Sequence, residues 1–75
     1  MKYMDKLLKL YREIQTKKQS LQLTLDHDKF DDWTLLIYHG DSKTIVFDGQ
    51  HADIDFLSSQ AYVALYNWFY FTLVK

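Results

Sequence analysis

The sequence contains no cysteine, no proline and only two glycines among its 75 residues. Without cysteine, disulfide bonds and thiolate metal sites are excluded, although both stabilise many small domains. With so few glycines, a glycine-rich phosphate-binding loop is excluded as well. A domain of this size buries only about 60% of its unfolded surface, so it needs a tight core, a partner, or both.

Long hydrophobic runs are also missing, whereas aromatic residues are plentiful. The longest apolar stretch is shorter than the roughly 20 residues that span a bilayer, and the N-terminus lacks the pattern of a signal peptide. We therefore expect a cytoplasmic protein without a transmembrane segment. Because 48% of the residues are hydrophobic and 17% aromatic, the chain is expected to fold as one compact domain over residues 1–75.

The apolar residues change their spacing along the chain, which predicts an α+β fold. Met4, Leu7 and Ile14 recur at helical spacing, with Leu10 at the edge of the stripe, and from Leu21 onward apolar and polar residues alternate as in a strand. The expected elements are helices over 3–18 and 55–74 and strands over 21–26, 33–38 and 43–47. This α-β-β-β-α order favours a three-stranded antiparallel sheet with both helices packed on one face. Residues 52–56 are ambiguous between a short fourth edge strand and the entry to the last helix, for which Asp53 and Asp55 are suitable first-turn residues.

The turn between the second and third strands decides which residues face the core. A two-residue loop would pair Leu35 with Val46, whereas a three-residue loop over 40–42 would pair Ile37 with Ile45. We prefer the second register because it separates the large apolar residues better. It directs Trp33, Leu35, Ile37, Ile45 and Phe47 inward, and it leaves Leu36, Tyr38 and Val46 on the outer face of the sheet.

The closing segment is too apolar for a surface helix with one polar side. Between Tyr62 and Val74, only Asn67 and Thr72 fall outside the apolar and aromatic residues. A helix of a small domain normally shows one apolar stripe, so the remaining apolar surface is expected to contact a neighbour. The opposing interpretation is that the tyrosine hydroxyls reach water and the first helix covers the rest. The predicted partner interface consists of Val63, Tyr66, Asn67, Tyr70, Phe71 and Val74, together with Leu36, Tyr38 and Val46.

This surface leads to the first functional hypothesis, a small non-enzymatic interaction module. The module would self-associate as a homodimer or dock on another protein. Tyr, Trp and Phe are enriched where protein interfaces bind strongly, which agrees with this interpretation.

The charges are unevenly distributed, which leads to the second hypothesis. Residues 1–18 are predominantly basic, and residues 26–55 are predominantly acidic. The acidic patch consists of Asp26, Asp28, Asp31, Asp32, Asp41, Asp48, Asp53 and Asp55. If these carboxylates converged on one face, they would imitate phosphates, as in a phage-type inhibitor of a nucleic-acid-binding protein. The competing interpretation assigns them to turn chemistry.

No motif predicts catalysis, a metal site or a cofactor. His27, His39 and His51 lie in Asp-rich loops and lack the spacing of a helix-borne metal site. The loop after Asp26 fails the calcium-binding pattern, because Phe30 takes the third ligand position. The serines lack a nucleophile elbow. We therefore expect no catalytic residue, no metal and no cofactor.

The predicted element order is shared with double-stranded RNA-binding domains, and this resemblance is one of topology only. Those domains approach phosphates with a basic start to their last helix. Here the corresponding segment, 53–59, contains two aspartates and no basic residue. We therefore expect no direct binding to nucleic acid.

Overall fold

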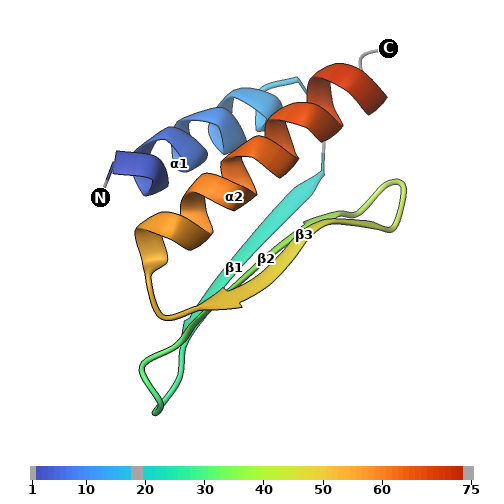
Figure 1. The fold of residues 1–75 in the computed structure, drawn as a ribbon. Coiled ribbons are helices and arrows are strands. Elements are labelled where there is room, and N and C mark those ends of the chain that lie inside the picture. Colours follow the sequence, from blue (N-terminus) through green and yellow to red (C-terminus); the bar gives the residue numbers. More distant parts are fainter. Residues whose placement is uncertain (1, 18–19, 74–75) are drawn as a thin grey trace.

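The computed structural model describes residues 2–17 and 20–73 and confirms the α-β-β-β-α order (Figure 1). The elements are α1 (Lys2–Gln15), β1 (Leu21–His27), β2 (Trp33–His39), β3 (Thr44–His51) and α2 (Ile54–Asn67), which continues as the π-helical segment η1 (Trp68–Leu73). The strands form one antiparallel sheet in the order β1-β2-β3. An α+β fold is therefore established, and within the described residues the sheet has no fourth strand.

Both helices lie side by side on one face of the sheet and run in the same direction (Figure 1). At their shared starting end, the backbone N–H of Tyr3 donates to Asp55 Oδ1 at 3.0 Å, and Met4 lies against Ser58 of α2. α2 packs over β2 and β3, and α1 packs against α2. We call the side of the sheet that carries no helix the open face.

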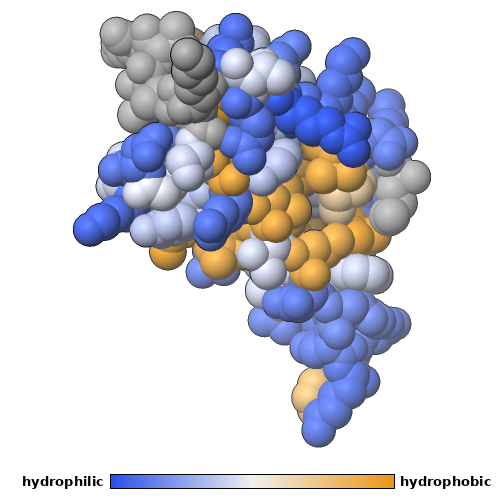
Figure 2. Space-filling model, turned by 180° about the vertical axis from the view of Figure 1, so that it is seen from behind, coloured by the Kyte–Doolittle hydropathy of each residue, from blue (hydrophilic) through white to orange (hydrophobic). Residues whose placement is uncertain are grey.

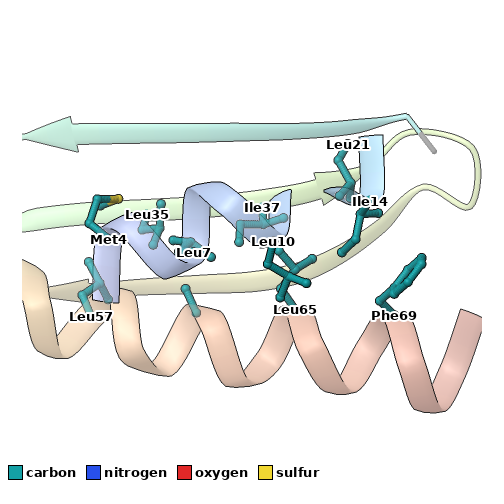
Figure 3. Packing of buried hydrophobic residues seen from close by; sticks show 11 residues of the cluster. Met4, Leu7, Leu10, Ile14, Leu21, Leu35, Ile37, Leu57, Leu65 and Phe69 are labelled. Carbon is teal, nitrogen blue, oxygen red and sulfur yellow. The ribbon is translucent and has the colours of Figure 1, made fainter. Parts of the chain in front are cut away.

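The core is a row of interlocking apolar side chains between the helices and the sheet (Figure 3). Figure 3 shows Met4 beside Leu57 at one end and Phe69 near Ile14 at the other. The buried apolar residues are Met4, Leu7, Leu10, Ile14, Leu21, Leu35, Ile37, Leu57, Ala61, Leu65 and Phe69. Leu10 therefore belongs to the core and not to its edge, because α2 packs on the flank of α1 that carries it.

The start of α2 resolves the ambiguity of residues 52–56 in favour of a helix entry. Asp53 has extended backbone angles, and its side chain accepts hydrogen bonds from the N–H groups of Asp55 and Phe56. These N–H groups have no partner inside the helix, so a carboxylate at this position satisfies them and also meets the positive end of the helix dipole. Asp53 thus caps the start of α2, whereas Asp55 accepts a hydrogen bond from the start of α1.

The predicted register between β2 and β3 is wrong near the turn. His39 pairs with Thr44, so the loop comprises residues 40–43, and Lys43 adopts a left-handed conformation with φ of 55°. Further along, Ile37 pairs with Phe47 while Tyr38 pairs with Ile45, which leaves Val46 as the extra residue of a β-bulge. The bulge turns Ile45 outward, where 58% of its surface is exposed, and lets Val46 pack against the core. These two residues therefore exchange their predicted places, whereas Phe47 keeps its inward position.

The cap at Asp53 gives a first test. We expect Asp53→Ala to lower the free energy of unfolding by about 1 kcal/mol, because two N–H groups of α2 lose their acceptor. In a domain of this size the melting temperature would fall by roughly 4–8 °C per kcal/mol. Asp53→Asn is the matched control and should keep most of the stability, because asparagine caps helices about as well as aspartate. Equal loss in both variants, measured by thermal and urea unfolding, would contradict this role of the side chain.

Candidate functional site

The side of α2 and its continuation η1 that faces away from the sheet carries a continuous set of exposed residues, which we call the outer side of α2. Val63 is 55% exposed and Phe71 is 63% exposed, and Tyr66 and Tyr70 are each exposed by about two fifths. Together with the exposed Asn67, these are the described members of the predicted helix interface. Val74 lies outside the described residues.

The packing of α1 explains why this surface stays uncovered. α1 offers a single apolar stripe, and that stripe is used against one flank of α2 and the sheet. Ala61 and Leu65 of α2 are completely buried by this contact and the sheet, whereas the described residues include no element above Val63. The contrasting interpretation, in which α1 covers the remaining apolar surface, is therefore wrong for Val63 and Phe71.

A groove of about 330 Å³ runs between the two helices beside the outer side of α2. Its wall on α2 and η1 is a row of tyrosines, with ring centroids 6.1 Å apart between Tyr62 and Tyr66 and 4.6 Å apart between Tyr66 and Tyr70. The groove is lined by Lys6, Lys9, Leu10, Glu13, Tyr62, Tyr66 and Tyr70, and we call it the tyrosine groove. The predicted interface did not include Lys6, Lys9 or Tyr62. The spacing of four residues between Tyr62, Tyr66 and Tyr70 could have indicated Tyr62, because it places the three tyrosines on one side of a helix.

The second predicted contact surface, on the open face of the sheet, forms only in part. Leu36 and Tyr38 lie there and are half-buried, as expected. Val46 does not, because the bulge directs it toward the core, and Ile45 takes its place opposite Tyr38. The neighbouring positions on this face are polar: Gln22, Thr24, Asp26, Asp48 and Gln50. The result is a small apolar spot within a polar surface.

The eight aspartates do not gather on one face. Asp41 lies in the β2–β3 loop, at the opposite end of the sheet from the β1–β2 hairpin that holds Asp28, Asp31 and Asp32. Asp26 and Asp48 project from the open face, and Asp55 lies at the shared start of the helices.

Several of these carboxylates take part in local structure. Asp28 Oδ1 accepts from the N–H groups of Phe30 and Asp32, which closes the hairpin turn, and Asp31 contacts His27 Nε2 at 2.8 Å. Asp53 and Asp55 accept from helix N–H groups, as described above. Turn and cap chemistry therefore accounts for three of the eight aspartates in the predicted acidic patch, and Asp31 adds a contact with a histidine.

The histidines lie at the ends of strands, and one of them is buried. Only 2% of His39 is exposed, and its ring contacts that of Trp68 with a centroid distance of 4.8 Å. Its Nδ1 accepts the backbone N–H of Ser42 at 3.3 Å and lies 2.6 Å from the Ser42 hydroxyl oxygen. The expectation that the three histidines occupy loops is thus wrong, because each is the last residue of a strand, and His39 belongs to the helix-facing side of β2.

The three residue types of a catalytic triad occur together at His39, Asp41 and Ser42. Their contacts, however, are those of a turn and not of a catalytic triad. Asp41 Oδ2 lies 3.9 Å from His39 Nε2, which is beyond hydrogen-bond distance. The Ser42 hydroxyl donates to Thr44 Oγ1 at 2.9 Å, and none of the three side chains lines the tyrosine groove. Among residues 2–17 and 20–73, no group of three histidine or carboxylate side chains is arranged to hold a metal ion.

Comparisons with protein-family models, with curated proteins and with solved structures gave no match. Within the described part of the chain, none of the helices is long and apolar enough to cross a membrane.

The bulge gives a second test, because it assigns opposite environments to neighbouring residues. We expect Val46→Thr to lower the free energy of unfolding by about 1 kcal/mol, since it brings a hydroxyl group against the core. Ile45→Thr should change it by less than about 0.5 kcal/mol, because Ile45 lies on the surface. Urea unfolding of both variants checks this, and a larger loss in Ile45→Thr would show that the bulge is misplaced.

Proposed function

We propose that this chain is a small non-enzymatic interaction module that docks on a protein surface through the outer side of α2. One observation carries the proposal: Val63 and Phe71 are more than half exposed on a helix whose opposite side is completely buried. Burying an apolar side chain of this size is worth about 1.5–3 kcal/mol when its burial is complete. A partner that covers both would gain a large part of that free energy.

The surroundings of these residues agree with the usual composition of a protein interface. Tyrosines, which are enriched among residues that dominate binding, lie beside the exposed apolar residues. Lys6 and Lys9 stand across the tyrosine groove and give the surface a charged rim. An apolar centre within a polar rim is the common arrangement of such interfaces.

Self-association and docking on a different protein are both compatible with this surface. A second copy could contribute its own outer side of α2 in a two-fold arrangement, because the same patch is then present on both subunits. Asn67 would lie near the centre of that contact and would restrict its register.

The phosphate-mimicking inhibitor has weaker support. It requires carboxylates that converge and are available to a basic partner, whereas Asp41 lies far from the hairpin and three of the eight carboxylates hold a turn or a helix start. Strong dependence of binding on salt would be its signature.

Site-specific photo-crosslinking tests the docking proposal directly. A photoreactive phenylalanine analogue is placed at position 71 or 63 in the intact chain and irradiated in cells of the source organism. We expect crosslinks from both positions, and none from position 50, since Gln50 is exposed on the open face of the sheet. The crosslinked species identifies the partner as a second copy or another protein.

A charge variant supplies the control. Val63→Lys combined with Phe71→Lys should abolish crosslinking from position 66, because covering an unpaired charge is costly. Gln50→Lys should leave it unchanged. If the double variant folds, as judged by circular dichroism, and keeps the crosslink, the outer side of α2 is not the docking surface.

A further inference from the structure

β1 has an unused edge, and the contacts around it show which backbone groups point there. β1 pairs with β2 only, so its other edge faces outward within the described part of the chain. The carbonyl of Ser20 accepts from Gly40 N–H, and Asp28 N–H donates to Asp32, so the even-numbered residues point toward β2. In an antiparallel sheet these directions alternate along the strand. The N–H and C=O groups of Leu21, Leu23, Leu25 and His27 therefore point to the open edge.

Gln15 already pairs with one of these residues as a strand would. Its side-chain amide donates to the carbonyl of Leu21 at 2.9 Å and accepts from the N–H of Leu21 at 3.2 Å. The hydroxyl group of Tyr11 donates a second hydrogen bond to the same carbonyl at 3.0 Å. The end of the edge near α1 is thus closed, and the part from Leu23 to His27 remains free to pair.

β1 has few features that discourage pairing along this free part, and its one carboxylate, Asp26, projects from the open face. Proteins commonly protect an edge with a proline, a lysine or a bulge, and β1 has none of these over Leu21–His27. The other edge of the sheet differs, because β3 carries the bulge at Val46. Of the two edges of the sheet, the β1 edge is therefore better suited to pair with another strand.

Apolar surface accompanies this edge. Leu23 and Leu8 pack only partly against the core, and 36% of Leu25 is exposed. Figure 2 shows apolar atoms gathered between the hydrophilic residues of α1 above and the hydrophilic hairpin below. A strand added beside β1 would extend the sheet beneath this apolar surface and cover part of it.

We propose that β1 pairs antiparallel with β1 of a second copy of this chain, so that the two sheets become one. Leu25 would face Leu25 of the second copy and exchange both backbone hydrogen bonds with it, and Leu23 would face His27. Registers that place a strand residue opposite Leu21 conflict with Gln15, which occupies that position. On the open face, Thr24 would stand opposite Asp26 of the second copy.

A second copy fits this edge because the edge is complementary to itself. Outward-pointing N–H and C=O groups occur at every second residue of the free part. When a two-fold rotation places a second β1 beside the first, each outward N–H group meets an outward carbonyl group of the other copy. Leu23 and Leu25 direct their side chains to the helix side, so leucine continues alongside leucine across the junction. The contact is isologous and closes after two copies, which leaves no further free β1 edge for growth into fibres.

The dimer leaves the outer side of α2 free in both copies, because α2 lies over β2 and β3, away from this edge. Both α2 surfaces would lie on the same side of the joined sheet. Such a dimer presents two docking surfaces, and its apparent affinity for a paired or repeated partner exceeds that of one copy. This inference does not depend on the docking proposal, and the two can fail separately.

Hydrogen exchange in the unaltered protein tests the pairing. NMR measurements are made on dilute and concentrated samples, together with sedimentation equilibrium. We expect the mass to rise from 9.1 kDa toward twice that value with concentration. Over the same range the amides of Leu23, Leu25 and His27 should become protected at least about tenfold, since they gain hydrogen bonds. The amide of Thr24, which already bonds to β2, should change little.

Two lysine variants of adjacent residues separate this edge from the rest of the molecule. Leu25→Lys should weaken dimerisation at least about tenfold, because an edge lysine opposes strand pairing. Thr24→Lys places the same charge on the open face opposite Asp26 of the second copy and should leave the dimer intact. Circular dichroism checks that both variants fold.

Four outcomes would overturn the inference. The first is a protein that stays monomeric at millimolar concentration. The second is a dimer in which the amides of Leu23, Leu25 and His27 exchange as fast as in the monomer. The third is a dimer that Val63→Lys with Phe71→Lys abolishes while Leu25→Lys does not, which would assign self-association to α2. Protection of the Leu25 amide only in the presence of another protein would also overturn it, since the occupant would then be a foreign strand.

Discussion

The contact between α1 and α2 is the constraint on which the rest of the structure depends. α1 has one apolar stripe, and the burial of Leu7 and Leu10 uses it against α2 and the sheet. The small residues Ser58 and Ala61, both completely buried, allow the two helices to approach closely. Since α1 is then fully used, α2 keeps its second apolar side in water.

A three-stranded sheet with helices on one face has other surfaces that a chain of this length cannot close. The β3 edge is protected by its bulge, and the open face is largely polar. The outer side of α2 and the free part of the β1 edge remain. They differ in chemistry, because the first presents side chains and the second presents backbone hydrogen-bonding groups, so they suit different partners.

Much of this arrangement follows from periodicity. The change from helical to alternating spacing after Gln15 is strong enough to specify the element order and the single helical layer. The exposure of Val63 and Phe71 could also be predicted, because a fully apolar helix on a small sheet has more apolar surface than one face can bury. The capping role of Asp53 could also be predicted, because aspartate is a preferred residue directly before the first turn of a helix.

Other features depend on contacts that no local pattern reveals. The loop over 40–43 places a lysine in the left-handed region, where a glycine would have indicated the length of the turn. Without that signal the bulge at Val46 is invisible in the sequence, and Ile45 and Val46 are assigned to the wrong sides. The burial of His39 depends on Trp68, which is distant in sequence, and the closure of the β1 edge depends on Gln15, a polar residue that resembles any other on a helix surface.

Within residues 2–17 and 20–73, the chain does not cover the outer side of α2 by itself. The most direct test of this exposure is the relaxation of side-chain protons by a soluble paramagnetic probe, measured by NMR on dilute monomeric protein. We expect strong relaxation of the Val63 methyl and Phe71 ring protons and almost none for Leu65, which is buried on the opposite side of the same helix. Relaxation of Val63 and Phe71 as weak as that of Leu65, in a particle whose mass is that of one chain, would contradict it.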